Sequence, residues 1–182
     1  MADVYFSVDV ETSGPVPGRY ALLSIGACRV DDPSVAFYSE LDPGDAEIDP
    51  EALEVSGLCP EGLAETGEAP AAALARFAEW VEAATPPGGR PVFVAFNAPF
   101  DWMFVAEALH RHVGRNPFGH AALDIKALAM GAGGLAWDAT SLASVAARFG
   151  GEARLPHHAL EDARLQADLF CRIIDHLQGR TP

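Results

Sequence analysis

Five side chains in this chain of 182 residues have the types and the order that hydrolysis at a metal site requires. Four of them are carboxylates, which offer the hard oxygen ligands that Mg²⁺ and Mn²⁺ prefer. The fifth is a histidine, which can accept a proton from water near neutral pH. The five residues are Asp9, Glu11, Asp101, His157 and Asp162.

The first two carboxylates stand at the end of an apolar segment, residues 4–10, that predicts a buried strand. Residues two apart share one face of a strand, so Asp9 and Glu11 are expected to point the same way. Crowded carboxylates repel each other unless a cation lies between them. An Asp-x-Glu pair is common, however, and a solvated strand end is the alternative interpretation.

The other three residues also stand next to predicted elements. Asp101 follows the continuous apolar run 92–96, which predicts a central strand, and ligands of α/β sheets bind at the carboxyl ends of strands. His157 and Asp162 stand at the start of the last amphipathic helix. Each has an ordinary alternative, namely a plain helix start around Asp101 and an exposed or capping histidine at position 157.

The elements that must position these residues alternate along the chain. Strands are predicted at 4–10, 21–30, 35–41, 92–96 and 121–125. Helices are predicted to begin at residue 50 and to cover 71–84, 99–112, 140–149 and 159–177. The glycine-rich residues 131–134 are expected to form a flexible loop. Three strands followed by helices that alternate with two more strands favour an α/β fold with a mixed sheet.

Length and composition favour a single domain, residues 1–182, with a hydrophobic core. No apolar run is long enough to span a bilayer and the N-terminus lacks signal-peptide features, so we expect a cytoplasmic protein without a membrane partner. Cys28, Cys59 and Cys171 lie far apart, and small buried side chains are a better interpretation of them than a disulfide framework or a zinc site.

The net charge of −14 has the wrong sign for a protein that follows a long nucleic acid by neutralising its phosphates. A nucleic-acid substrate would have to be held locally, by metal ions and by a few cations such as Arg111 or Arg115. Lys126 is the only lysine. Trp80 and Trp137 are expected to be packed aromatics rather than platforms for bases.

Taken together, three segments resemble the motifs of the DEDDh, or DnaQ-like, 3′→5′ exonuclease superfamily. They are residues 8–12, 96–101 and 157–162, and the last has the form His-x₄-Asp. Further segments, including 21–27 and 115–118, resemble the ribonuclease T family. The resemblance implies a ribonuclease H-like fold whose mixed five-stranded sheet begins with an antiparallel meander of three strands. It also implies hydrolysis of the terminal phosphodiester at the 3′ end of single-stranded nucleic acid, with RNA favoured over DNA.

By the same resemblance, two divalent ions, Mg²⁺ or Mn²⁺, are expected in the site. Asp9 would bridge both ions, and Asp101 would hold the second one. Glu11 and Asp162 would hold the first ion, and His157 would act as the general base. Four residues are expected around the terminal nucleotide: Thr12 and Ser13 through their backbone groups, with Phe100 and Trp102 nearby. A homodimer is a further expectation, because ribonuclease T works as one.

Other functions stay open at this point. A proofreading exonuclease that serves a DNA polymerase would use the same residues. A degenerate nuclease domain that only binds nucleic acid would be expected to lack a metal ligand, whereas all five positions are filled here. A metal-dependent phosphohydrolase of small nucleotides would be consistent with the acidic composition.

Overall fold

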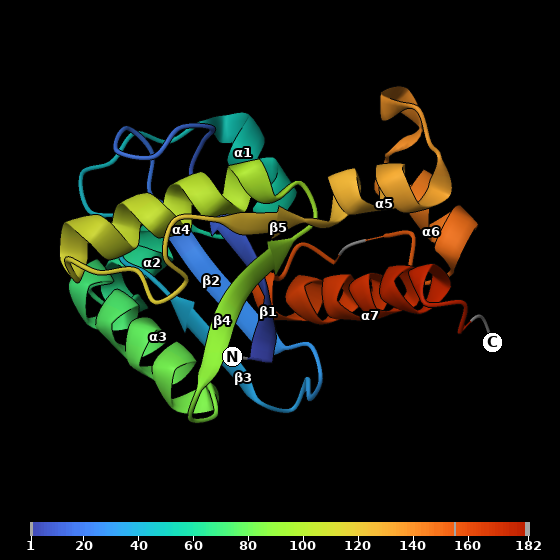
Figure 1. Ribbon diagram of the computed structural model, residues 1–182. Helices are drawn as coiled ribbons and strands as arrows, with labels where there is room; N and C mark the ends of the chain where they lie inside the picture. The colour runs from blue at the N-terminus through green and yellow to red at the C-terminus, as the bar shows by residue number, and fades with distance from the viewer. Residues whose placement is uncertain (1, 155, 181–182) are drawn as a thin grey trace.

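The computed structural model describes residues 2–154 and 156–180, which form an α/β structure around one mixed sheet (Figure 1). The order of the strands across the sheet is β3-β2-β1-β4-β5. The strands are β1 (Ala2–Thr12), β2 (Leu22–Arg29), β3 (Ala36–Glu40), β4 (Gly89–Ala95) and β5 (Ala122–Asp124). The pairs β1–β2 and β2–β3 are antiparallel, while β1–β4 and β4–β5 are parallel. The predicted mixed sheet with an antiparallel meander of three strands is confirmed.

Helices cover both faces of this sheet. They are α1 (Pro50–Ser56), α2 (Pro60–Thr66), α3 (Pro70–Ala84), α4 (Ala98–His112), α5 (Ile125–Gly133), α6 (Leu142–Phe149) and α7 (Ala159–Leu177), with a short 3₁₀ helix η1 (Trp137–Ala139). Val8 and Val10 of β1 belong to the hydrophobic cluster that contains α3 and α4. A second cluster joins Val94 of β4 to α5, α6 and α7. The central strands are therefore buried on both faces, as their apolar sequences predict.

Two helices differ from the sequence-based predictions. The strand predicted at 121–125 ends at Asp124, and residues 125–133 form helix α5 where a flexible loop was expected at 131–134. The Asp124 carboxylate accepts hydrogen bonds from the N–H groups of Lys126 and Ala127, so it caps this helix. Gly134 ends it in the left-handed conformation that favours glycine. Helix α2 was not predicted. Within the described residues, no helix is both long enough and apolar enough to cross a bilayer.

The start of α7 lies directly against β2 at Gly26. A Cβ atom at Gly26 would lie 2.1 Å from the Leu160 nitrogen and 2.2 Å from the Ala159 carbonyl carbon. Gly26 is also the residue that pairs with Asp9 in the β1–β2 register. Because Gly26 has no side chain, the first turn of α7 can pack directly on the sheet beside Asp9.

We predict that Gly26→Ala destabilises the protein by about 1–3 kcal/mol or more, because the added methyl group meets backbone atoms that cannot rotate away. The nuclease activity that the motifs lead us to expect should fall as well, because the added methyl group would push the start of α7 away from Asp9. Gly131→Ala is the matched control: it adds the same methyl group inside α5, with nothing within 4 Å, and should stabilise the chain by roughly 0.5–1 kcal/mol. Urea unfolding midpoints measure both changes, and equal midpoints for the two variants would contradict the prediction.

Candidate active site

Asp9 and Glu11 lie on the α7 side of β1, and each side chain is 9% exposed. Val10, between them, points into the core on the opposite face. The Gln166 amide nitrogen donates a hydrogen bond of 2.6 Å to Asp9 Oδ1, and the Gln166 Oε1 accepts one of 2.8 Å from the Phe96 N–H. Gln166 therefore connects the central carboxylate to the end of β4.

Asp101 reaches the same place from the first turn of α4. Its Oδ1 accepts a hydrogen bond of 3.2 Å from the Val10 N–H, and its side chain is only 4% exposed. The pairing of β1 with β4 ends at Ser7, so the Val10 N–H lies beyond the ladder and is bonded by this carboxylate instead. Asn97, before the helix, has a φ of 66°, which turns the chain from β4 into α4.

His157 and Asp162 come from the start of α7. Ligand atoms of Glu11, His157 and Asp162 all lie within 4.8 Å of one another. Asp162 is 1% exposed, and its Oδ1 has no hydrogen-bond partner among the described residues. His157 is exposed and has a φ of 59°, an uncommon conformation for a residue other than glycine. The structure thus brings together the five residues that the motifs pointed to.

His158 lies apart from this cluster, although it is the neighbour of His157. Its ring stacks on Tyr38 of β3, with centroids 4.6 Å apart and an interplanar angle of 19°. It also holds the N-cap position of α7, and its carbonyl accepts a hydrogen bond from the Asp162 N–H. Its contacts therefore give it a structural position beside the site.

Burial raises the pKa of every carboxyl in the cluster, and repulsion by neighbouring carboxylates raises the pKa of Asp9, Glu11 and Asp101 further. Burial, with the charge of Asp162, raises the pKa of Glu11 to about 7. Burial raises the pKa of Asp101 to about 8, and it raises the pKa of Asp9 well above its ordinary range, with Asp101 the next cause for Asp9. The pKa of Asp162 is raised by burial too. Carboxylates in such surroundings ionise together only when cations offset their repulsion, so the residues fit a site for divalent metal ions.

The four expected substrate residues make contacts within the protein. The Ser13 hydroxyl is fully buried, donates to the Glu47 carbonyl and accepts from the Ala21 N–H. The buried Thr12 hydroxyl donates to the Gly14 carbonyl at 2.9 Å. The half-buried rings of Phe100 and Trp102 pack on the core, with centroids 5.4 Å from Phe104 and 5.2 Å from Phe93, respectively. Contacts of these four residues with a nucleotide stay a prediction.

Gln166 is a site residue that the sequence analysis missed. It follows Asp162 by four residues, so both lie on the same face of α7. A 1% exposed glutamine on the apolar face of a helix needs polar partners, and it finds them in Asp9 and Phe96. The polar side chain one turn after Asp162 was the available signal.

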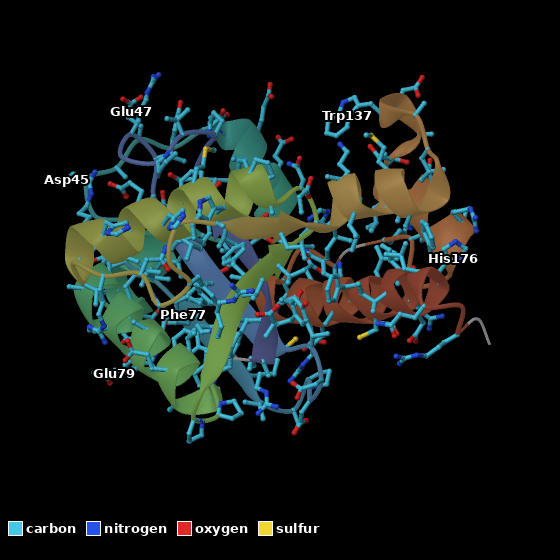
Figure 2. The ribbon with its side chains drawn as sticks, in the orientation of Figure 1. Asp45, Glu47, Phe77, Glu79, Trp137 and His176 are labelled. Atoms are coloured by element: carbon cyan, nitrogen blue, oxygen red, sulfur yellow. The ribbon has the colours of Figure 1, made fainter. Side chains whose placement is uncertain are left out.

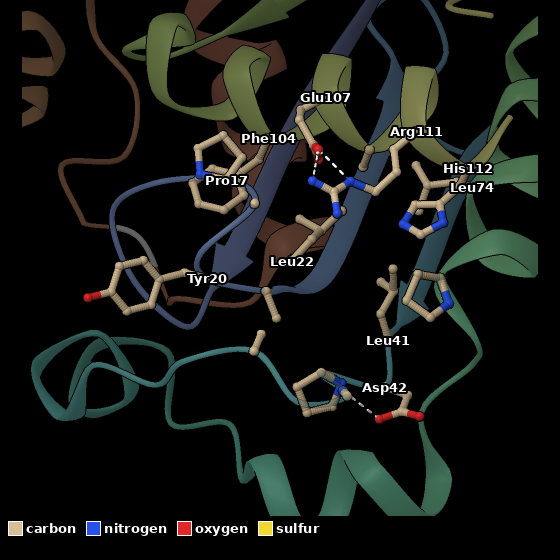
Figure 3. A pocket seen from close by; sticks show the side chains of 17 residues that line it. Pro17, Tyr20, Leu22, Leu41, Asp42, Leu74, Phe104, Glu107, Arg111 and His112 are labelled. Carbon is tan, nitrogen blue, oxygen red and sulfur yellow. Dashed lines mark hydrogen bonds and ion pairs between the residues drawn. The ribbon is translucent and has the colours of Figure 1, made fainter. Parts of the chain in front are cut away.

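The arginines expected to contact the substrate are held by carboxylates of the protein. Arg111 pairs with Glu107 at 2.5 Å, and Arg115 pairs with Glu82 at 2.9 Å. Arg111 lines a pocket of about 260 Å³ on the α4 side of the sheet, where Leu22 and Leu41 form part of the wall (Figure 3). None of the five catalytic candidates lines this pocket.

Comparison with known proteins agrees with this geometry. A family model described as "Exonuclease", that of ribonuclease T, matches residues 6–170. The chain is 45% identical over 178 residues to "3′-5′ DNA exonuclease Cap18" of Escherichia coli, a match that covers 98% of this chain and 95% of that protein. It is 30% identical over 179 residues to ribonuclease T of Salmonella typhimurium, which covers 92% of this chain and 83% of the relative.

Solved structures of exonuclease I share the fold. The complex of the Escherichia coli enzyme with a dT13 oligonucleotide superposes with a TM-score of 0.74 and 20% identity. The zinc-bound form of that enzyme in its complex with single-stranded DNA gives 0.75 and 17%. Both matches cover 98% of this chain but only 42% of the exonuclease I chain. At this identity the likeness shows the ribonuclease H-like fold alone.

The fold and the site together define a metal-dependent exonuclease of the 3′→5′ type. The chain belongs to the ribonuclease T family of exonucleases, within the DEDDh superfamily that its motifs resemble.

The raised pKa values predict how the metal-free protein responds to pH. Glu11, with an ordinary pKa of 4.5, titrates at about 7 in the folded protein, and Asp101, with an ordinary pKa of 3.8, titrates at about 8. The folded state therefore binds protons more tightly than the unfolded state between about pH 4 and 8, so stability should fall as pH rises through this window.

Thermal unfolding in chelator should show this loss between about pH 5 and 8 in the wild type. Asp101→Asn keeps the acceptor for the Val10 N–H and removes the charge, so it should gain stability relative to the wild type as pH rises. Asp45→Asn is the matched control, because Asp45 is exposed on the surface loop before α1 (Figure 2). A constant difference between Asp101→Asn and the wild type across the window would contradict the prediction.

Proposed function

We propose that this enzyme removes nucleotides from the 3′ end of single-stranded DNA, with two divalent ions and with His157 as general base. The relative with 45% identity is named as a DNA exonuclease, whereas ribonuclease T is 30% identical. This difference in identity supports DNA over the RNA that the sequence resemblance favoured. The cytoplasm as its location and a homodimer as its assembly are parts of the same proposal.

The observation that carries the proposal is the cluster of Glu11, His157 and Asp162 beside the buried Asp9. Asp9, Glu11 and Asp162 would hold one ion, and Asp9 with Asp101 would hold the other. Mg²⁺ or Mn²⁺ is the proposed occupant, because oxygen donors dominate the set. When bound, such ions supply Lewis acidity and offset the negative charge that builds up on the phosphate.

His157 has the position that a general base needs. It lies at the edge of the carboxylate cluster and is exposed, so a proton taken from water can pass on to solvent. Its place is set by the turn before α7, where its backbone has a φ of 59°. Gln166 would act as a positioning residue. Its hydrogen bond to Oδ1 orients Asp9 and leaves Oδ2 available for a ligand.

A test of this proposal uses 5′-labelled DNA and RNA strands of equal sequence, each with a free or a blocked 3′ end. With Mn²⁺ or Mg²⁺, we expect stepwise shortening of free-ended DNA, slower shortening of RNA, and no shortening when the 3′ end is blocked. Excess chelator should abolish the reaction, since the carboxylates need cations to act together.

Asp9→Asn should abolish turnover because it removes the carboxylate that both ions would share. The metal-free variant should be as stable as the wild type or more so, since a buried charge is lost. Asp3→Asn, in the same strand but paired with Arg90, serves as control and should keep full activity. Full activity of Asp9→Asn, or endonucleolytic products, would refute the proposal.

His157→Ala should lower the rate by about 10²–10⁴, the range expected for a positioned general base. The rate of the wild type should fall at acid pH, because only the neutral imidazole accepts a proton, and this limb of the profile should change in the variant. His120→Ala removes an exposed histidine elsewhere and should leave the profile intact. If His157→Ala keeps the wild-type rate, the base is another group, and His158 would be tested next.

A further inference from the structure

Trp137 has an unexpected environment. The sequence analysis expected it to be packed, as Trp80 is against the α3–α4 cluster, but its side chain is 61% exposed. It stands in the α5–η1 segment (residues 125–139), which continues from the carboxyl end of β5 and projects from the body of the molecule (Figures 1 and 2). The expectation was wrong because the short helix η1 contributes no buried residue.

Lys126 lies against this tryptophan. Its ammonium nitrogen is 4.3 Å from the centroid of the Trp137 ring, a cation–π contact at an exposed site. An amine placed over a largely exposed indole leaves part of the ring surface open to solvent. The only lysine of the chain and the most exposed large apolar side chain among the described residues thus form one surface, which we call the Lys126–Trp137 pair.

The basic residues of the protein are otherwise mostly neutralised. Of the twelve Lys and Arg residues, all of which lie in the described part of the chain, nine arginines form ion pairs with carboxylates. Three have no such pair with a carboxylate of the described residues: Lys126, Arg148 and Arg154. All three stand between β5 and α7, the stretch of chain that connects Asp124 to His157. A phosphate that approaches the protein therefore meets its available cations here.

Hydrogen bonds join the start of α5, which carries Lys126, to the start of α4, which carries Asp101. One oxygen of Asp124 accepts both from the Ala98 N–H at 3.1 Å and from the Lys126 N–H at 3.2 Å. Ala98 is the first residue of α4, and Asp101 follows in the same turn. The first turn of α5 is therefore fixed against the start of the helix that carries Asp101.

We propose that the Lys126–Trp137 pair binds the substrate strand on the 5′ side of the cleaved bond, with a base stacked on the Trp137 indole and a phosphate paired with Lys126. The proposal rests on the proposed function, because it needs a strand whose 3′ end lies at the carboxylates. An indole can stack on any base, and one ammonium group neutralises one phosphate. Binding through this contact therefore depends on the length of the strand and not on its sequence.

The chemistry of the pair favours nucleic acid over a protein partner. An apolar protein interface would cover Trp137 but would leave the Lys126 ammonium buried without a carboxylate or phosphate partner. A strand of DNA presents stacked bases and phosphates in alternation and satisfies both groups at once. The contact also suits an enzyme with a net charge of −14, since it requires a single cation to bind a polyanion.

The experiment compares KM for a DNA strand of about ten nucleotides with KM for a dinucleotide, using the metal-loaded enzyme. The wild type should prefer the longer strand. Trp137→Ala should raise KM for the longer strand about 5- to 100-fold, the usual effect of losing one base–aromatic stack, so that the preference for length disappears. Trp137→Phe, which keeps an aromatic face, should restore most of it. Lys126→Gln should lower the magnitude of the log–log salt slope of binding by about 0.7.

Two matched controls test whether the effect belongs to this surface. Leu177→Ala truncates a side chain of similar exposure at the far end of α7, and Arg90→Gln removes a cation at the start of β4. Both should keep the wild-type preference for length and the wild-type salt slope. If the wild type shortens DNA and Trp137→Ala keeps the preference, this inference is wrong while the proposed function stands. If the wild type shortens no strand, the proposed function fails first.

Discussion

Repulsion among four buried carboxylates is the constraint on which the rest of this structure depends. Asp9, Glu11, Asp101 and Asp162 are each less than one tenth exposed, and all of their pKa values are raised. Such a group would separate if its side chains stood on mobile loops. Instead, the carboxylates stand on a strand buried on both faces and on the first turns of two helices. Two hydrophobic clusters, one on each face of the sheet, hold these elements in place.

Three contacts near the site involve both the backbone of the fold and the carboxylates. Asp101 bonds the backbone of β1, Gln166 links Asp9 to the end of β4, and Gly26 lets α7 touch β2. Each contact connects two elements and also places one carboxylate. The carboxylates that make these contacts are also the candidate metal ligands, so bound cations would relieve the repulsion among them. Under this proposal, metal binding would affect both stability and activity.

The basic side chains of two parts of the molecule differ in whether carboxylates pair with them. The arginines outside the region between β5 and α7 are engaged by carboxylates, which suits a soluble acidic surface and leaves little attraction for a polyanion. The remaining cations are found close along the chain to Asp124 and His157. An acidic exonuclease of this kind would engage its substrate locally, through metal ions and a few contacts, and would rely little on long-range attraction.

The sequence by itself determined the α/β fold, the mixed sheet and the five catalytic candidates, because periodicity and motif order are local properties of the chain. It did not predict helix α5, whose start depends on the Asp124 carboxylate that also bonds α4. Gln166, the pairing of Arg115 with Glu82 and the exposure of Trp137 were also decided only by the tertiary structure. Each depends on which distant residues become neighbours: the spacing of Gln166 from Asp162 places both on one face of α7, but only the folded chain brings Asp9 against that face.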